Sequence, residues 1–312
     1  MVTKRPNYQK NYLNKVIHDF FKKNRPKNIT LIMLNEPLGS IDEIFPTLKH
    51  CNIIRMSYAD IESYCLNNPG LYITLGSNYV PKHVRESVAR YASIRKSNRT
   101  KSYIKQLIKK DCQVFWISVR EPNRTIANQE EFLVNLAISI LQEFPKSKII
   151  FDGYSIPEDI NLPNRHDVKL IEISIQIEHG LIEQIIKKIS AKQELESSDI
   201  LFNCSGLRIL DSIALAQLVT FYVCHHGTIQ HKIGWFTETP GYVHSNSEIL
   251  KLLPGDYVAG QGENLKTPHY ENFEEVNQKK AKQNETQKLD NYYFNNDKSI
   301  IKNIINIARN FM

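Results

Sequence analysis

Short apolar runs alternate with amphipathic stretches through the second half of the chain. Four of these runs predict buried strands, at residues 113–119, 148–151, 200–204 and 221–224. Apolar side chains also recur at helical spacing over residues 129–143, 182–192, 209–218 and 228–236. Strands that alternate with helices across short connections are typical of a parallel sheet with helices on both faces. We therefore predict a Rossmann-like α/β domain over residues 111–260.

The first half of the chain shows the same alternation in shorter segments. Its apolar runs predict short strands at residues 29–34, 53–56 and 71–75. Residues 11–23 carry one apolar helical face, and residues 82–110 form a helical stretch that is rich in lysine and arginine. These elements predict a second Rossmann-like domain, over residues 1–110.

The C-terminal part of the chain has a different character. Lysine, asparagine, glutamine and glutamate dominate residues 261–297, which predicts a polar, loosely packed excursion. Isoleucines then return at helical spacing in residues 298–312 and predict an amphipathic helix. Such a helix is typical either of a packed core or of a membrane-surface anchor.

Composition narrows the class of protein. The chain of 312 residues is 41% hydrophobic and 23% charged, which is an ordinary globular balance. Its net charge of +7 suits an anionic partner, such as a nucleotide diphosphate, an anionic lipid headgroup or nucleic acid. Five scattered cysteines without a Cys-x-x-Cys pair imply neither a disulfide framework nor a zinc site. Neither a signal peptide nor a membrane-spanning run is evident, so we expect a cytoplasmic protein whose membrane contact is peripheral.

Polar clusters follow three of the predicted strands, and ligands of open α/β sheets bind beyond the carboxyl ends of strands. The first cluster holds Arg120, Arg124 and Asn128. Two guanidinium groups on one loop can bind phosphate oxygens bidentately, which lysine cannot do. In the alternative interpretation, one arginine pairs with Glu121 or Glu130 and only fixes the loop.

The second cluster contains His226, Gly227, Thr228, His231 and Lys232, between a predicted strand and a predicted helix. Gly227 lets the backbone approach a ligand closely, and the N–H groups that begin a helix favour an anion. The alternatives are a structural turn and a metal site. No spacing of three or four residues links these histidines to a carboxylate, so we expect no bound metal.

Two weaker signals complete the set. Asp152 and Gly153 follow the strand at 148–151, where the carboxylate could accept a ribose or sugar hydroxyl or could cap a turn. The basic stretch at 82–110 is typical of a solvated helix face, and contact with a lipid surface or a polyanion is the alternative.

Two segments resemble motifs of family 61 glycosyltransferases. The first reads Ile117-Ser-Val-Arg120, followed by Asn123-Arg124-Thr-Ile-Ala-Asn128-Gln-Glu130-Glu131. The second reads Leu210-Asp211-Ser-Ile-Ala-Leu215, followed by the strand and turn from Phe221 to Gly227. The resemblance covers about residues 110–245 and implies a GT-B-like α/β fold, in which two facing Rossmann-like domains have mostly parallel sheets. In that fold the domain at 111–260 would hold the nucleotide sugar, and the domain at 1–110 would lie on the acceptor side.

The same resemblance implies a function. It implies an inverting, metal-independent transfer of a sugar from a nucleotide-sugar donor to a glycan or lipid-linked acceptor, in capsule or lipopolysaccharide synthesis. The nucleotide sugar is a co-substrate, and neither a bound cofactor nor a nucleic-acid partner is expected. By position, Arg120, Arg124 and Asn128 would line the cleft, and His226 and Gly227 would face the donor diphosphate.

The sequence departs from the family pattern at two places. Thr228, Gln230 and His231 stand where the family has small residues, and the N-terminal segment 39–46 lacks the family's histidine. Asp42 is therefore our first candidate for the general base, although a first-turn carboxylate also favours its own helix.

Two further candidates for the base and two other functions stay open. Glu36 is the second candidate and His83 the third. A pyruvyl-type transfer to a polysaccharide is a rival reaction. A non-catalytic nucleotide- or glycan-binding protein is a rival of another class.

Overall fold

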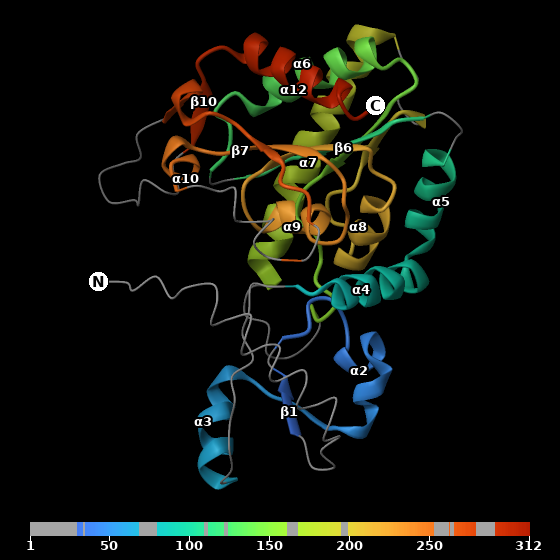
Figure 1. Cartoon of the computed structure of the whole chain (residues 1–312), viewed down its shortest axis with the longest axis vertical. Helices are drawn as coiled ribbons and strands as arrows, with labels where there is room; N and C mark the ends of the chain where they lie inside the picture. Colours follow the sequence, from blue (N-terminus) through green and yellow to red (C-terminus); the bar gives the residue numbers. More distant parts are fainter. Residues whose placement is uncertain are drawn as a thin grey trace. The chain divides into compact units, whose positions relative to one another are not determined.

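The computed structural model describes most of the chain (Figure 1). The described residues are 30–33, 35–68, 80–108, 112–121, 124–160, 168–194, 199–252, 262, 265–278 and 291–312. Two compact units divide the chain, Met1–Asn78 and Tyr79–Met312. The helix predicted at 11–23 and the strand predicted at 71–75 lie outside the described residues.

The first unit contains a pair of parallel strands. β1 (Thr30–Met33) runs beside β2 (Asn52–Arg55), and both strands occupy the places that their apolar runs predicted. The other elements described in this unit are α2 (Ile41–Ile44), the 3-10 turn η1 (Pro46–His50) and α3 (Tyr58–Asn67).

A six-stranded sheet forms the centre of the second unit. Its strands, in spatial order, are β5 (Leu201–Asn203), β4 (Lys148–Asp152), β3 (Val114–Ser118), β6 (Phe221–His225), β7 (Gly241–His244) and β8 (His269–Tyr270). Every neighbouring pair is parallel, which confirms the predicted α/β class with mostly parallel sheets. The chain builds outward from β3 to β5, returns to the other side of β3 with β6, and continues outward again. The strand order therefore reverses between β3 and β6, which is the switch point of a doubly wound sheet.

Helices cover both faces of this sheet. One layer consists of α6 (Gln129–Glu143), α7 (Val168–Gln193) and α12 (Asp297–Arg309), and Figure 1 shows α6 and α12 side by side. The opposite layer consists of α4 (Lys82–Arg95), α5 (Asn98–Leu107), α8 (Ile209–Ala216) and α9 (Thr228–Gly234). Alternate side chains of β3 supply the two cores: Phe115 and Ile117 face the first layer, and Trp116 faces the second. Each such buried side chain contributes roughly 1.5–3 kcal/mol of transfer free energy.

The unit boundary lies earlier in the chain than residue 110, where composition placed it. The reason is that α4 and α5 pack on α8, so their apolar faces belong to the second core. Val88, Ala92 and Leu107 are buried on these two helices.

The described residues within 261–297 are more ordered than their polar composition predicted. They include β8, the 3-10 turn η3 (Phe273–Glu275), and the antiparallel pair β9 (Val276–Gln278) and β10 (Tyr292–Phe294). A short helix, α10 (Ser247–Leu250), precedes them. Val276, Tyr292 and Phe294 enter the first core, although they are too few to show a period in the sequence. The predicted C-terminal helix is confirmed as α12.

Candidate functional site

The loops that follow β3 and β6 meet beyond the carboxyl ends of these strands. A Cβ atom added to Gly227 would lie 3.1 Å from Nη1 of Arg120 and 3.9 Å from Nη2 of Arg124. Gly227 also has φ +133°, in the range that L side chains rarely adopt. Two guanidinium groups and an open stretch of backbone therefore share one place at the switch point.

The charge of Arg124 makes the charge of Arg120 less favourable. Burial lowers the pKa of Arg120, and the charge of Arg124 lowers it further, against smaller opposite effects that include Glu178. Nη1 of Arg120 donates to the carbonyl of His226 at 3.4 Å. The Nε of Arg124 is buried and finds no hydrogen-bond acceptor among the residues that the structure describes. An anion held between these side chains would relieve both conditions.

The backbone of the arginine loop is fixed from two sides. The side chain of Gln129, at the start of α6, accepts from the N–H of Arg120 at 3.0 Å and donates to its carbonyl at 2.9 Å. Arg124 has φ +57°, a left-handed conformation that is uncommon for a residue other than glycine. Strained backbone of this kind tends to occur at functional sites.

The histidines of the second cluster are neutral at pH 7. Burial, then Arg124 and Arg120, lower the pKa of His226 to about 4. Burial, then His226, lower the pKa of His231 to about 4. The ring of His231 stacks on Trp235 with the centroids 3.9 Å apart. Both side chains can therefore contribute hydrogen bonds but no net charge. Thr228 begins α9, and its side chain lies outside the described part of the structure.

Asp152 and Lys232 were both predicted to contact the donor, and the structure pairs them with each other. Their ion pair is buried, and Nζ of Lys232 also donates to the carbonyl of Gly153 at 2.6 Å and to Ser155 Oγ at 3.0 Å. Burial raises the pKa of Asp152 to about 6, although Lys232 opposes the shift. This pair ties α9 to the carboxyl end of β4, and a direct contact with a donor stays a prediction.

Asn128 joins the start of α6 to the start of α12. Its Nδ2 donates to Oδ2 of Asp297 at 2.6 Å, and no side-chain bond of Asn128 caps α6. The amide that sequence analysis placed in the cleft therefore holds the C-terminal helix against the arginine loop.

The candidates for the general base fall into two groups. Glu36 and Asp42 lie together in the first unit, where Nε of Arg55 is 2.5 Å from Glu36 and Nη2 is 2.8 Å from Asp42. Hydrogen bonds from Ser40 and then from Arg55 lower the pKa of Asp42.

The third candidate lies elsewhere. His83 is exposed on the first half of α4, between Lys82 and Arg85. Those neighbours pack beside Gln217 and Thr239, at the amino ends of β6 and β7. The structure therefore does not bring His83 to the edge of the sheet where Arg120 lies.

Sequence analysis missed a buried carboxylate at the same edge. Glu178 on α7 is 1% exposed and accepts from the backbone N–H of Glu121, at 3.2 Å, and of Tyr154. It thus bridges the loops that follow β3 and β4. Burial raises the pKa of Glu178 to about 7. A signal existed, because Glu178 falls on the helical face whose other buried members are Ile171, Ile182, Ile185 and Ile189.

A buried group of aromatic and hydroxyl side chains lies beneath the arginines and was also missed. The Nδ1 of His225 is 3.0 Å from Ser118 Oγ, and its ring lies 4.4 Å from that of His244. The Nδ1 of His244 shares a hydrogen bond of 2.5 Å with the hydroxyl of Tyr292. Only the fold brings these residues together, since Tyr292 is 48 positions from His244.

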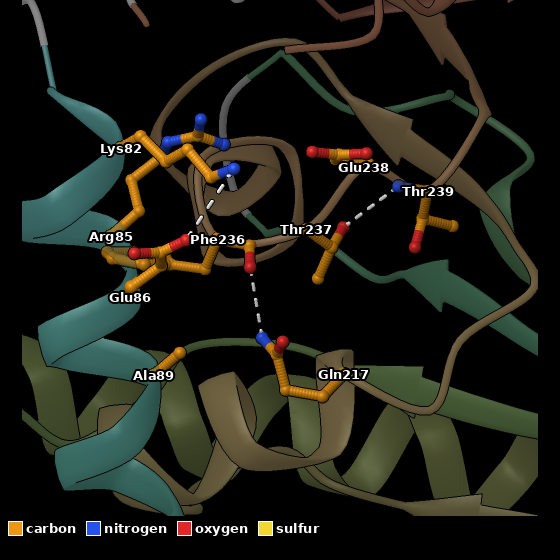
Figure 2. A pocket seen from close by; sticks show the side chains of 9 residues that line it. All are labelled: Lys82, Arg85, Glu86, Ala89, Gln217, Phe236, Thr237, Glu238 and Thr239. Atoms are coloured by element: carbon orange, nitrogen blue, oxygen red, sulfur yellow. Dashed lines mark hydrogen bonds and ion pairs between the residues drawn. The ribbon is translucent and has the colours of Figure 1, made fainter. Parts of the chain in front are cut away.

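A hollow of about 390 Å³ lies at the other edge of the sheet (Figure 2). Figure 2 shows Lys82, Arg85 and Glu86 of α4 facing Gln217 and the segment Phe236–Thr239. Gln217 precedes β6, and residues 236–239 precede β7. The hollow is therefore separated from the switch point by the length of the strands. Its opposed charges, including the Lys82–Glu86 ion pair at 3.8 Å, give it no clear preference for one ligand.

The described residues show neither a metal site nor a membrane span. Within those ranges, no three His, Cys, Asp or Glu side chains are grouped so that they could hold a metal ion. Nor does any helix among them combine the length and the apolar character needed to span a membrane.

Comparison with known proteins gives distant structural similarities only. No family model and no curated protein sequence matches this chain. The E. coli ADP-heptose lipopolysaccharide heptosyltransferase II is similar with 9% identity and a TM-score of 0.41, over 95% of this chain and 80% of that one. The S. aureus MnaA–UDP co-structure is similar with 12% identity and a TM-score of 0.34, over 86% and 69%.

The UDP-forming α,α-trehalose-phosphate synthase of Burkholderia vietnamiensis is similar with 9% identity and a TM-score of 0.34. The match covers 50% of this chain and 34% of the synthase, so it spans about a third of that protein's length. Any functional conclusion must therefore rest on the side chains at the switch point.

Proposed function

We propose that this protein is a glycosyltransferase that binds the diphosphate of a nucleotide-sugar donor between Arg120, Arg124 and the backbone of Gly227. One observation carries the proposal: these three groups converge at the switch point between β3 and β6. Open α/β sheets bind ligands at this place, beyond the carboxyl ends of the strands.

The charges of the site support a doubly anionic ligand. The lowered pKa of Arg120 means that its charge is less well stabilised in the ligand-free protein than in water. A diphosphate would offset that cost and would accept the bidentate hydrogen bonds that guanidinium groups form with phosphate oxygens. The missing Cβ at position 227 leaves the space for such an approach.

The same groups fit the chemistry of transfer. An acceptor hydroxyl oxygen attacks the anomeric carbon, and the bond from that carbon to the diphosphate oxygen breaks. Negative charge then develops on the departing nucleoside diphosphate, where Arg120 and Arg124 would stabilise it. A general base takes the acceptor's proton, with inversion at the anomeric carbon and without a metal ion. We assign this base to the first unit, with Asp42 ahead of Glu36.

A second candidate function is binding without transfer. The ion pairs with Arg55 favour it, because a carboxylate with a lowered pKa is a weaker base. Nucleotide binding without release of nucleoside diphosphate, in the presence of acceptors, would identify this alternative.

The rest of the proposal concerns the acceptor and the cellular place. We propose a glycan or lipid-linked acceptor in the synthesis of a surface polysaccharide, at the cytoplasmic face of the membrane. The stretch from Lys82 to Ile108 holds eight basic residues and one acidic residue, which supports contact with anionic lipid. We do not expect a nucleic-acid partner.

Donor binding is tested by replacing one arginine. Arg124→Ala should weaken the binding of the preferred nucleoside diphosphate about 10- to 100-fold, because it removes charge-assisted hydrogen bonds worth about 1.5–3 kcal/mol each. Calorimetric titration with UDP, GDP and ADP, and with their sugar conjugates, measures this effect and also names the nucleotide.

Arg309→Ala is the matched control. Arg309 pairs with Glu143 at 2.6 Å, at the far end of α6 from the arginine loop. The Arg309→Ala variant should bind nucleotides with the affinity of the wild type. If Arg124→Ala also binds them with unchanged affinity, the assignment of the site is wrong.

A further inference from the structure

Tyr292 is fully buried. Its backbone is hydrogen-bonded to the loop that carries Arg124. Its N–H donates to the carbonyl of Thr125 at 3.0 Å, and the N–H of Ala127 donates to its carbonyl at 2.6 Å. The side chain of Asn291 also accepts from the N–H of Thr125 at 3.1 Å. The segment that follows Arg124 is therefore hydrogen-bonded to β10 and not only to its own neighbours.

The side chain of Tyr292 reaches the other loop of the site. Its hydroxyl shares the 2.5 Å hydrogen bond with Nδ1 of His244. The carbonyl of His244 accepts from the N–H of His226 at 2.9 Å, and Gly227 comes next in the chain. One residue of β10 thus connects the loop that carries Arg124 with the loop that carries Gly227.

The conformation of Arg124 shows why such a connection matters. With φ +57°, its backbone lies in a region that costs about 1–3 kcal/mol for a residue other than glycine. The hydrogen bonds of Asn291 and Tyr292 to the next residues hold the chain in that conformation. If they were lost, the guanidinium of Arg124 would be expected to move relative to the backbone of Gly227.

We propose that Tyr292 is a positioning residue that fixes the spacing between Arg124 and Gly227, so that both reach one diphosphate. That this spacing serves to bind a diphosphate rests on the proposed function. The role of Tyr292 in setting the spacing does not rest on it. Tyr292 touches no ligand in this scheme. It acts through Thr125 and Ala127 on one side, and through His244 on the other.

Tyr292→Phe tests the proposal, because it keeps the ring and removes only the hydroxyl. Hydrogen exchange on the ligand-free protein should be faster in peptides that cover residues 124–128 and 225–228. The dissociation constant for inorganic pyrophosphate, and for UDP, should rise about fivefold, which is the effect of one lost hydrogen bond on an equilibrium. In an Arg124→Ala background the same change should have no further effect on affinity, because the two residues act on one contact.

Tyr242→Phe is the matched control. Tyr242 is also fully buried, on β7 of the six-stranded sheet, and its hydroxyl bonds to Glu271. It should lose a similar amount of stability on thermal unfolding, without faster exchange at 124–128 and without weaker binding. Asn291→Ala keeps the tyrosine and removes the acceptor for Thr125. It should give the same faster exchange, so the test survives if Tyr292→Phe does not fold.

The outcomes are separable. Unchanged exchange at 124–128 in both Tyr292→Phe and Asn291→Ala overturns the positioning role, as does equal acceleration in Tyr242→Phe. A wild-type protein that binds neither pyrophosphate nor any nucleotide overturns the proposed function, while the exchange results still decide the role of Tyr292.

Discussion

The molecule holds two clusters built around arginine, and they differ in what surrounds the charge. Arg55, in the first unit, is 40% exposed and contacts two carboxylates, so hydrogen bonds to Glu36 and Asp42 raise its pKa. Arg120, in the second unit, is partly buried next to Arg124, so its pKa is lowered. The charge of Arg55 is offset within the protein. The second cluster becomes more favourable when an anion enters, which is the electrostatic signature of a binding site rather than of a structural ion pair.

The comparison also separates two kinds of support. The Arg55 cluster lies within 20 positions of sequence, from Glu36 to Arg55, and one side of it is the short helix α2. The Arg120–Arg124 pair depends on the nearby Gln129, but also on β10 and on the loop after β6, which are distant in sequence. A ligand site that draws on several elements can respond to changes made far from it.

The largest effect is expected at the Arg55 cluster. It tests whether this cluster also takes part in catalysis of the proposed transfer. Asp42→Asn should lower turnover about 10²- to 10⁴-fold, because it removes the first candidate for the general base, while donor affinity stays unchanged. Release of nucleoside diphosphate under saturating donor and acceptor measures turnover. Glu43→Gln, at the neighbouring first-turn carboxylate of α2, serves as the control. Full turnover in Asp42→Asn would leave the cluster with a structural role alone.

A smaller effect is expected at the glycine of the second cluster. Gly227→Ala places a Cβ at 3.1 Å from Arg120 Nη1, on a backbone with φ +133°. The strain should lower the free energy of unfolding by about 1–3 kcal/mol, and the displaced arginine should weaken donor binding. Urea unfolding and calorimetric titration measure the two effects. Gly180→Ala is the control, because nothing lies within 4 Å of its added Cβ. Unaltered donor affinity in Gly227→Ala would remove the backbone of residue 227 from the site.

The smallest expected effect is a dependence of stability on pH that comes from the buried Glu178. The pKa of Glu178 is raised to about 7 from its ordinary value of 4.5, so the folded state binds this proton more tightly than the unfolded state does. The resulting stabilisation is fully present below about pH 4.5 and is lost as the pH rises toward 7. It amounts to about 1–3 kcal/mol.

Glu178→Gln should flatten this part of the pH dependence. Urea unfolding at pH 5, 6, 7 and 8 measures it, with Glu248→Gln, at a partly exposed carboxylate on α10, as the control. Two results together would contradict the assignment. The wild-type free energy of unfolding would rise between pH 5 and 7 with no other group responsible, and Glu178→Gln would show the same slope.

The local elements were predictable because their signals are local. The four buried strands at 113–119, 148–151, 200–204 and 221–224 appear as β3, β4, β5 and β6, since each is a continuous apolar run between polar breaks. β7 was not predicted, because Tyr242 and Val243 are its only large apolar residues and a pair is too short for a period. β10 was hidden in a polar region for the same reason.

The sequence by itself determined the alternation of strands and helices in the second unit and marked Arg120, Arg124 and Gly227 as unusual residues at strand ends. Apolar periodicity decides which segments are buried, and a parallel sheet brings the ends of its strands to one edge. Only the tertiary structure decided that Lys232 would turn inward to Asp152, that Asn128 would hold α12, and that Tyr292 would join the two loops of the site. The physical reason is that a polar side chain forms hydrogen bonds with the groups that the packed elements place within about 3 Å of it. Which groups these are does not depend on how far apart they lie in the sequence.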